Sequence, residues 1–258
     1  MPQLVLTARD GDIATVTINR PAKKNALNRA TFAALKDAIA QVSADDALRC
    51  IVIRGAGGTF VAGADISGFE TERATREQVR AYSDLTDATL HAIAACRHPT
   101  VALIEGYCMG AGVELAAGCD LRIAARSAKF AVPSKRMGLF LSYPLLEGLV
   151  RIVGPATAAE LVLEGRVMEA DEALMKGLVT RVVADDAVAD EAYATARRIV
   201  EGAPLAARHH KQAIRRLADP RPLTEQEVEA SLDYVDSEDY RIGYRAFLAK
   251  KKPAFKGR

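Results

Sequence analysis

The sequence has no marked excess of either charge, and this absence limits what the protein can bind. Its 258 residues carry 35 basic and 33 acidic side chains, which leaves a formal net charge of +2. Proteins that coat nucleic acid carry a strong basic excess, so we expect no nucleic-acid partner. No apolar run approaches the roughly 18 residues of a membrane span. The opening MPQLVLTARDGD lacks the basic and apolar regions of a signal peptide. We therefore expect neither a membrane segment nor a signal peptide.

The sequence also has few cysteines, and their spacing excludes the common zinc sites. The four, Cys50, Cys96, Cys108 and Cys119, form no C-x-x-C pair and have no histidine at zinc-finger spacing beside them. Scattered thiols of this kind are typical of small buried side chains in a reducing compartment. With 50% hydrophobic and 26% charged residues, the chain can bury a large core, which excludes wholesale disorder. We expect a cytoplasmic enzyme without a metal site.

Segments typical of strands and of helices alternate through the first half of the chain. Residues 4–7 and 13–18 flank the turn signal Asp10-Gly11-Asp12 and predict a hairpin. After it we expect a helix over 28–44, a strand over 50–53, a helix over 75–95, a strand over 100–104, a helix over 113–117 and a strand over 121–124. This alternation predicts an α/β fold with a parallel sheet and helical crossovers.

The remainder of the chain has a mostly helical pattern. Pro155 suits the first position of a helix, and one short strand is expected over 179–183. The helices are expected over 155–165, 169–176, 187–202, 204–218, 224–234 and 237–250. We place a soft boundary near residue 195, which divides a core over 1–195 from a helical C-terminal region over 196–258.

Two glycine-rich segments follow two of the expected parallel strands. Residues 51–65 read IVIRGAGGTFVAGAD, and residues 101–120 read VALIEGYCMGAGVELAAGCD. In each, a buried strand runs into small residues that allow a close approach of the backbone to a ligand. Since ligands bind outside the carboxyl ends of parallel strands, we expect the two loops to meet at one edge of the sheet. An ordinary tight turn is the alternative interpretation of 62–65.

Glu114 is the candidate for acid–base chemistry. The glycines of Gly110-Ala111-Gly112 open a helix, where free N–H groups and the helix dipole favour a negative or polarised oxygen. Glu114 follows one turn further in, on the same helical face as Ala111. A buried acid beside an oxyanion site can serve as a general acid or base. The alternative is a carboxylate that pairs with a basic neighbour such as Arg122.

Five segments share an order and spacing with a known family. They are residues 16–21, KKNALN at 23–28, GTFVAGADI at 58–66, GYCMGAGVELAAGCDLRIAA at 106–125 and EDYRIGYRAFLAKKKPAFKGR at 238–258. Together they resemble the crotonase, or enoyl-CoA hydratase/isomerase, superfamily over essentially the whole chain. The resemblance implies a crotonase-like spiral of β-β-α units, followed by a helical C-terminal region. It also implies homotrimers, often paired into hexamers.

The resemblance further implies that an acyl-CoA thioester is the substrate. Its carbonyl is expected between the backbone N–H groups of Ala64 and Ala111, with Glu114 as the catalytic carboxylate. Coenzyme A is then part of the substrate, and no separate cofactor is expected. The residues assigned to substrate contact are Lys24, Ala26, Ala62, Gly63, Asp65, Ile66, Gly110, Ser134 and Tyr143.

One departure from the family pattern bears on the reaction. Hydratases of the superfamily use two glutamates, and the resemblance places the second at the position of Ser134. A serine hydroxyl is no base at neutral pH without an activating partner, so the paired-carboxylate arrangement lacks its second member. A bulky segment over 139–147 also replaces a glycine-rich stretch. Within it, Tyr143 and Glu147 either point into the pocket or are a packed aromatic and a surface acid.

The expected activity is enoyl-CoA hydratase/isomerase chemistry through a stabilised thioester enolate. Because the second glutamate is absent, other reactions on the same scaffold are alternatives: thioester hydrolysis, decarboxylation or C–C bond cleavage. An alternative of a different class is a catalytically weak oligomer that binds acyl-CoA or associates with RNA. Turnover of crotonyl-CoA, as opposed to CoA binding without turnover, separates these possibilities.

Overall fold

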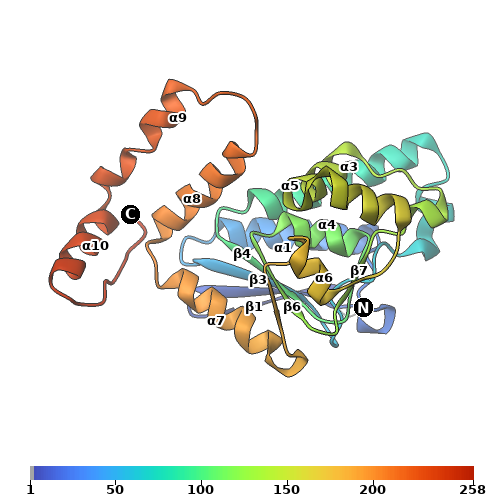
Figure 1. Ribbon diagram of the computed structural model, residues 1–258, viewed down its shortest axis with the longest axis horizontal. Coiled ribbons are helices and arrows are strands. Elements are labelled where there is room, and N and C mark those ends of the chain that lie inside the picture. The colour runs from blue at the N-terminus through green and yellow to red at the C-terminus, as the bar shows by residue number, and fades with distance from the viewer. Residues whose placement is uncertain (1–2) are drawn as a thin grey trace.

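The chain folds around a six-stranded sheet, seen in a computed structural model that describes residues 3–258 (Figure 1). The strand order is β1-β2-β3-β4-β6-β9. β1 and β2 form the predicted antiparallel hairpin, and every other neighbouring pair is parallel. The parallel α/β sheet expected from the sequence is therefore confirmed. The strands are β1 (Val5–Asp10), β2 (Ile13–Ile18), β3 (Cys50–Gly55), β4 (Thr100–Ile104), β6 (Leu121–Ala125) and β9 (Arg181–Val183).

Helices cover both faces of this sheet and enclose a separate core on each (Figure 1). α1 (Arg29–Ala44), α3 (Arg76–Ala95) and α4 (Ala111–Gly118) lie on one side, and α7 (Val188–Val200) lies on the other. α1 begins as predicted, because the side chain of Asn28 accepts a hydrogen bond from a first-turn N–H at 2.9 Å. Successive residues of β3 and β4 enter the two cores alternately, as in sheets buried on both faces.

A second, three-stranded sheet shapes the loop that leads into α4. It joins β5 (Tyr107–Met109), β7 (Lys129–Ala131) and β8 (Met168–Glu169). The sequence analysis expects no strand between those over 100–104 and 121–124, so β5 was missed. Three residues are too few to show the alternation that identifies a strand. The small sheet thus fixes a segment that the sequence pattern leaves irregular.

The helix α5 (Tyr143–Ala159) begins well before the start predicted at Pro155. Pro144 occupies its first turn, a position that proline favours. Gly154, with φ 72°, interrupts the helix, so Pro155 does begin a new helical segment. The first segment was missed because proline and glycine within 144–154 disfavour a helix interior. The short helices of the core are α2 (Phe69–Glu72) and α6 (Ala170–Met175).

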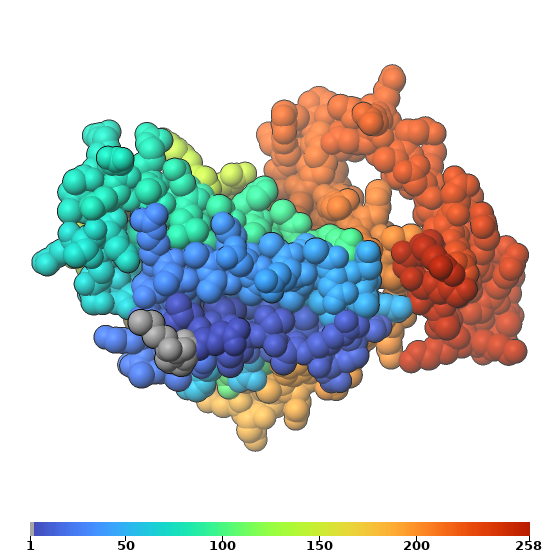
Figure 2. All heavy atoms as spheres, turned by 180° about the vertical axis from the view of Figure 1, so that it is seen from behind, coloured from blue at the N-terminus to red at the C-terminus, as the bar shows by residue number. Residues whose placement is uncertain are grey.

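The last three helices form an arm that projects from the body around the sheet (Figure 1). They are α8 (Pro204–Leu217), α9 (Glu225–Ala230) and α10 (Glu238–Leu248). Figure 2 shows this arm in orange and red, standing apart from the body along much of its length. The helical C-terminal region is therefore present. α7 packs on the sheet as far as its last residue, Val200. The boundary between two regions near residue 195 stays a prediction.

Two expectations from the sequence concern a membrane segment and the state of the cysteines. No helix within 3–258 is long and apolar enough to cross a membrane. All four cysteines are buried, and none of them is in a disulfide. Their side chains therefore contribute to the core, as small apolar groups do.

Candidate active site

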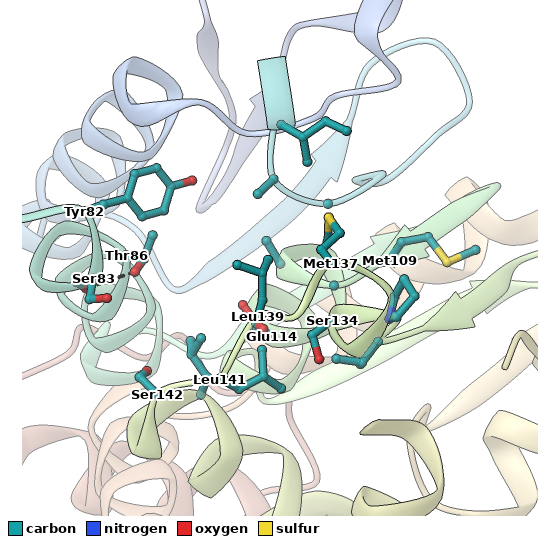
Figure 3. Close-up of a pocket in the computed structure, with 18 of the residues that line it drawn as sticks. Tyr82, Ser83, Thr86, Met109, Glu114, Ser134, Met137, Leu139, Leu141 and Ser142 are labelled. Carbon is teal, nitrogen blue, oxygen red and sulfur yellow. Dashed lines mark hydrogen bonds between the residues drawn. The ribbon is translucent and has the colours of Figure 1, made fainter. Parts of the chain in front are cut away.

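A cavity of about 420 Å³ lies where the segments after β3 and β5 meet α3 and the start of α5 (Figure 3). It brings together most of the residues that the sequence analysis assigned to a site. The predicted residues that line it are Ala62, Gly63, Ala64, Ile66, Gly110, Ala111, Glu114 and Ser134. Those outside its lining are Lys24, Ala26, Asp65 and Tyr143. The two glycine-rich loops thus meet at one edge of the sheet, as predicted.

Backbone contacts hold the two glycine-rich loops together. The N–H of Val61 donates to the carbonyl of Tyr107 at 2.9 Å, and the N–H of Met109 donates to the carbonyl of Val61 at 2.9 Å. Gly110 has φ 48° and ψ −113°, a combination that favours glycine. A Cβ atom at Gly112 would lie 2.5 Å from the Val61 carbonyl oxygen. A side chain at either glycine would therefore strain or separate the loops.

Two backbone N–H groups at this junction have no hydrogen-bond acceptor within residues 3–258. The N–H of Leu27 donates to the Gly63 carbonyl at 2.8 Å, and its carbonyl accepts from the Asp65 N–H at 2.8 Å. The N–H of Ala64, between these two, is left unused. Ala111 is the first residue of α4, so its N–H has no partner inside the helix. Both alanines line the cavity.

Glu114 lies in the first turn of α4 and lines the same cavity. Burial most of all, and the Asp87 carboxylate as well, raise its pKa from 4.5 to about 7, while the Arg73 cation opposes both effects. Arg122, the alternative partner for this acid, donates instead to two backbone carbonyls at 2.9 and 2.8 Å. Glu114 is therefore a carboxyl group that can hold or release a proton near neutral pH.

The wall of the cavity formed by α3 and by Arg73, which precedes it, was not predicted from the sequence. Arg73 and Tyr82 line the cavity, and Asp87 is close enough to affect the pKa of the catalytic candidate. Burial raises the pKa of Asp87 itself, and a serine hydroxyl donates to it at 3.0 Å. Ser83 and Thr86 line the cavity beside them. The polar side chains of α3 are spaced three and four residues apart, which could have indicated that they share one helix face. Polar residues with this spacing are also typical of a solvated helix face.

Ser134 begins the short 3-10 helix Ser134–Met137 and is 7% exposed. Its hydroxyl has no hydrogen bond to a basic side chain in the part of the chain that the structure describes. Leu139 and Leu141, from the bulky segment that follows, line the same cavity as Glu114 (Figure 3). The cavity wall is therefore apolar here, as the sequence analysis expected.

The assignment of Tyr143 to substrate contact stays a prediction, because its side chain is 90% exposed and lies outside the cavity lining. This position follows from the helix that begins there. Leu145 lines the cavity, and residues two apart on a helix point in different directions. Glu147 is likewise exposed and outside the lining. Neither side chain reaches Glu114 in this structure.

Lys24 and Asp65 lie beside the cavity. The Lys24 ammonium is 4.7 Å from the centre of the Tyr107 ring, on an exposed part of the surface. Hydrogen bonds from Ser67 and Arg20 lower the pKa of Asp65 to about 2, and the Arg20–Asp65 ion pair measures 2.8 Å. Asp65 therefore fixes the loop that carries Ala64 rather than facing the cavity.

Asn25 is a further structural residue that the sequence analysis did not single out. It is fully buried in the KKNALN segment, with φ 57°. Its side-chain amide donates to the carbonyls of Ala56 and Thr59 at 2.8 and 2.6 Å, and its oxygen accepts from the Arg20 N–H at 2.9 Å. These bonds fasten the segment before Leu27 to the loop after β3.

Comparison with known proteins gives one consistent result. The sequence profile of the enoyl-CoA hydratase/isomerase family matches residues 8–258. A probable enoyl-CoA hydratase of Mycobacterium tuberculosis is 36% identical over 255 residues, covering 98% of both chains. A short-chain-enoyl-CoA hydratase of Clostridium acetobutylicum is 34% identical over 258 residues, also covering 98% of both. The structure of an enoyl-CoA hydratase/carnithine racemase from Magnetospirillum magneticum matches with a TM-score of 0.97 and 46% identity, over 99% of this chain and 96% of that one.

Proposed function

The chain belongs to the enoyl-CoA hydratase/isomerase family, with the crotonase fold, and from this premise we propose that it transforms the double bond of an acyl-CoA thioester. In the proposal, the thioester oxygen binds to the N–H groups of Ala64 and Ala111. Glu114 moves the protons. Coenzyme A enters as part of the substrate, and no separate cofactor takes part.

The two free amides supply the electrophilic part of the reaction. When water adds to carbon β of a 2-enoyl thioester, or when a proton leaves an adjacent carbon, electrons move onto the thioester oxygen. Two N–H groups directed at that oxygen stabilise the enolate more than the neutral carbonyl, and the amino end of α4 adds a favourable dipole. This stabilisation serves hydration and isomerisation equally.

Glu114 supplies the proton transfers. In hydration its carboxylate takes a proton from water as the oxygen bonds to carbon β, and the protonated group then returns the proton to carbon α of the enolate. In isomerisation it removes a proton from one carbon and returns it to another. A pKa near 7 suits one group to both steps. The observation that carries the proposal is this buried acid in one cavity with two amides that have no partner among the described residues.

Because Ser134 occupies the position of the second glutamate, other reactions of the scaffold are alternatives. With one carboxylate, Glu114 can also direct water at the thioester carbonyl, or protonate the enolate left by decarboxylation or C–C cleavage. The products distinguish these reactions: a 3-hydroxyacyl-CoA from hydration, free CoA from hydrolysis, carbon dioxide from decarboxylation and a shortened acyl-CoA from cleavage. Binding of thioesters without any product indicates a catalytically weak acyl-CoA-binding protein.

Replacing Glu114 by glutamine tests the proposal, because it preserves the shape of the side chain and removes the proton acceptor. Glu114→Gln is expected to reduce turnover of crotonyl-CoA, or of a better acyl-CoA substrate, by about a hundredfold or more. Binding of butyryl-CoA, measured by calorimetry, should change little. Glu147→Gln, at an exposed acid outside the cavity, is the matched control and should keep wild-type turnover. Full activity of Glu114→Gln would refute the assignment.

We also propose that the protein self-associates as a trimer or a dimer of trimers. The arm of α8 to α10 exposes large apolar side chains, among them Leu232, Tyr234, Phe247 and Leu248. Phe247 is 84% exposed, and a monomer leaves this surface in contact with water. A symmetric assembly would cover it with other copies. The four unpaired thiols support the further proposal of a cytoplasmic location.

A further inference from the structure

We propose that the cavity binds a carboxylate at its acyl end, so that the preferred substrate is an acyl-CoA whose acyl group itself ends in an acid. This inference rests on the proposed function, which places the thioester at the two amides and the acyl group in the cavity. Two polar side chains of the cavity wall carry it, the guanidinium of Arg73 and the hydroxyl of Tyr82.

Arg73 follows α2 and lines the cavity. Its guanidinium carbon lies 4.1 Å from the centre of the Phe69 ring and 3.6 Å from that of Tyr82, so two aromatic contacts hold the cation in place. The Nε atom is buried and has no hydrogen-bond partner within the described residues. A cation that is partly removed from water is unfavourable unless an anion pairs with it. Arg73 therefore lacks the partner that such a position calls for.

Tyr82 is 4% exposed and supplies the second donor. From α3 its ring extends toward the interior of the cavity (Figure 3). Its hydroxyl oxygen is buried and interacts with the Arg73 guanidinium, but the O–H itself has no acceptor in the described part of the chain. A buried donor without an acceptor is unfavourable, and an acceptor on a bound ligand would remove that cost. The two unpaired donors adjoin each other, since the guanidinium of Arg73 lies over the Tyr82 ring.

The acids near Arg73 do not serve as its partner. Asp87 accepts a hydrogen bond from Ser142 at 3.0 Å. The carboxyl group of Glu72 packs against the glycine that precedes its own short helix. Glu114 has its pKa raised to about 7, so at neutral pH it carries only part of a charge. None of the three forms an ion pair with Arg73 among residues 3–258, so the guanidinium has no carboxylate partner in this part of the chain.

Another part of the cavity wall is apolar, and this contrast orients the ligand. Met137, Leu139 and Leu141 line the cavity there (Figure 3). The methylene groups of an acyl chain can contact these side chains, while a terminal carboxylate accepts hydrogen bonds from Arg73 and Tyr82. A terminal methyl group would leave both donors unpaired. The subsite therefore favours an acid over a hydrocarbon of the same length.

Matched pairs of saturated acyl-CoA thioesters test this preference without turnover. The members of a pair have equal carbon numbers and end in a carboxylate or in a methyl group. The pairs are succinyl-CoA with butyryl-CoA, glutaryl-CoA with pentanoyl-CoA, and adipoyl-CoA with hexanoyl-CoA. By titration calorimetry, the acid of at least one pair is expected to bind the wild type about tenfold more tightly than its methyl partner.

Three variants test which side chains cause the preference for a terminal carboxylate. Arg73→Gln is expected to abolish it while methyl-terminated thioesters keep wild-type affinity within about threefold. Tyr82→Phe removes only the hydroxyl and should weaken the preference less. Arg76→Gln, at an exposed arginine at the start of α3, is the matched control and should leave the preference unchanged. If Arg73→Gln does not fold, the wild-type comparison and Tyr82→Phe still decide the question.

Each outcome discriminates between the two proposals. Methyl-terminated thioesters that bind as tightly as the acids at all three lengths would overturn the carboxylate subsite and leave the proposed function intact. A loss of affinity in Arg73→Gln that is equal for both members of a pair would give Arg73 a structural role, which also overturns the subsite. Failure of every thioester to bind the wild type would overturn both proposals.

Discussion

Glu114 should destabilise the folded protein at alkaline pH, so that its replacement by glutamine stabilises it there. Burial raises the pKa of this carboxyl group from 4.5 to about 7, which means that the folded state binds the proton more tightly than the unfolded chain does. Well below pH 4.5 the group is protonated in both states and contributes no difference. As the pH rises toward 7, the folded state has to accept a buried charge, and stability is lost. Above pH 7 the loss becomes constant.

The two pKa values set the size of the effect. Each tenfold change in proton affinity corresponds to about 1.4 kcal/mol. The unfolding free energy is therefore lowered by about 1 kcal/mol at pH 5 and by about 3 kcal/mol at pH 8.5. Glu114→Gln keeps the shape and removes the titration, so it should recover these amounts. For a chain of this size, about 3 kcal/mol corresponds to a rise in Tm of about 6 to 12 °C.

Thermal unfolding of the wild type and Glu114→Gln at the two pH values measures this difference. Both proteins are compared at one concentration, because assembly also affects Tm. The difference between the two proteins cancels the pH dependence of all groups that they share. Glu147→Gln, at an exposed acid, should change Tm little at either pH. An equal Tm difference between wild type and Glu114→Gln at pH 5 and pH 8.5 would refute the reasoning.

Two further outcomes follow from the site and the arm. The kcat/KM of the wild type should rise through about pH 7 as Glu114 loses its proton. Arg73→Gln removes a cation that lowers the pKa of Glu114, so this variant should show the rise at higher pH. A pH profile of kcat/KM that is flat around neutrality would contradict this role of Glu114. Light scattering at micromolar concentration should give the mass of a trimer or a dimer of trimers, because Phe247 and Leu248 are exposed on the arm, whereas a monomer would contradict the proposed assembly.

The junction of the two loops could be predicted because it depends on local features of the sequence. Buried strands that run into glycine-rich turns bring their backbones to the same edge of a parallel sheet. Gly110 before Ala111 marks the start of a helix, and the position of Glu114 in its first turn follows from helical geometry. One part of the site therefore lies in short segments whose turns and helix start are already marked by their own residues.

The wall of the cavity formed by Arg73 and α3 could not be predicted, because it depends on how α3 packs across the cavity. Ser83, Thr86 and Asp87 form a polar pattern that a solvent-facing helix would also show. Arg73 follows a four-residue helix, too short to be identified by its period. Whether Tyr143 faces the cavity could not be decided from the sequence for a related reason, since the start of α5 at that residue determines which side chains of the segment face inward.

Within residues 3–258 the side chain of Glu114 has no ion-pair partner, and α4 gives the physical explanation. A cation paired with this acid would hold its pKa low and remove a base that works near pH 7. Arg122, the arginine nearest in sequence, instead donates to the carbonyl of Cys119 at 2.8 Å, at the carboxyl end of the helix. There its charge complements the negative end of the helix dipole, whereas Glu114 lies at the positive end. The length of α4 thus keeps the two charges apart, and the acid stays available to a substrate in the cavity.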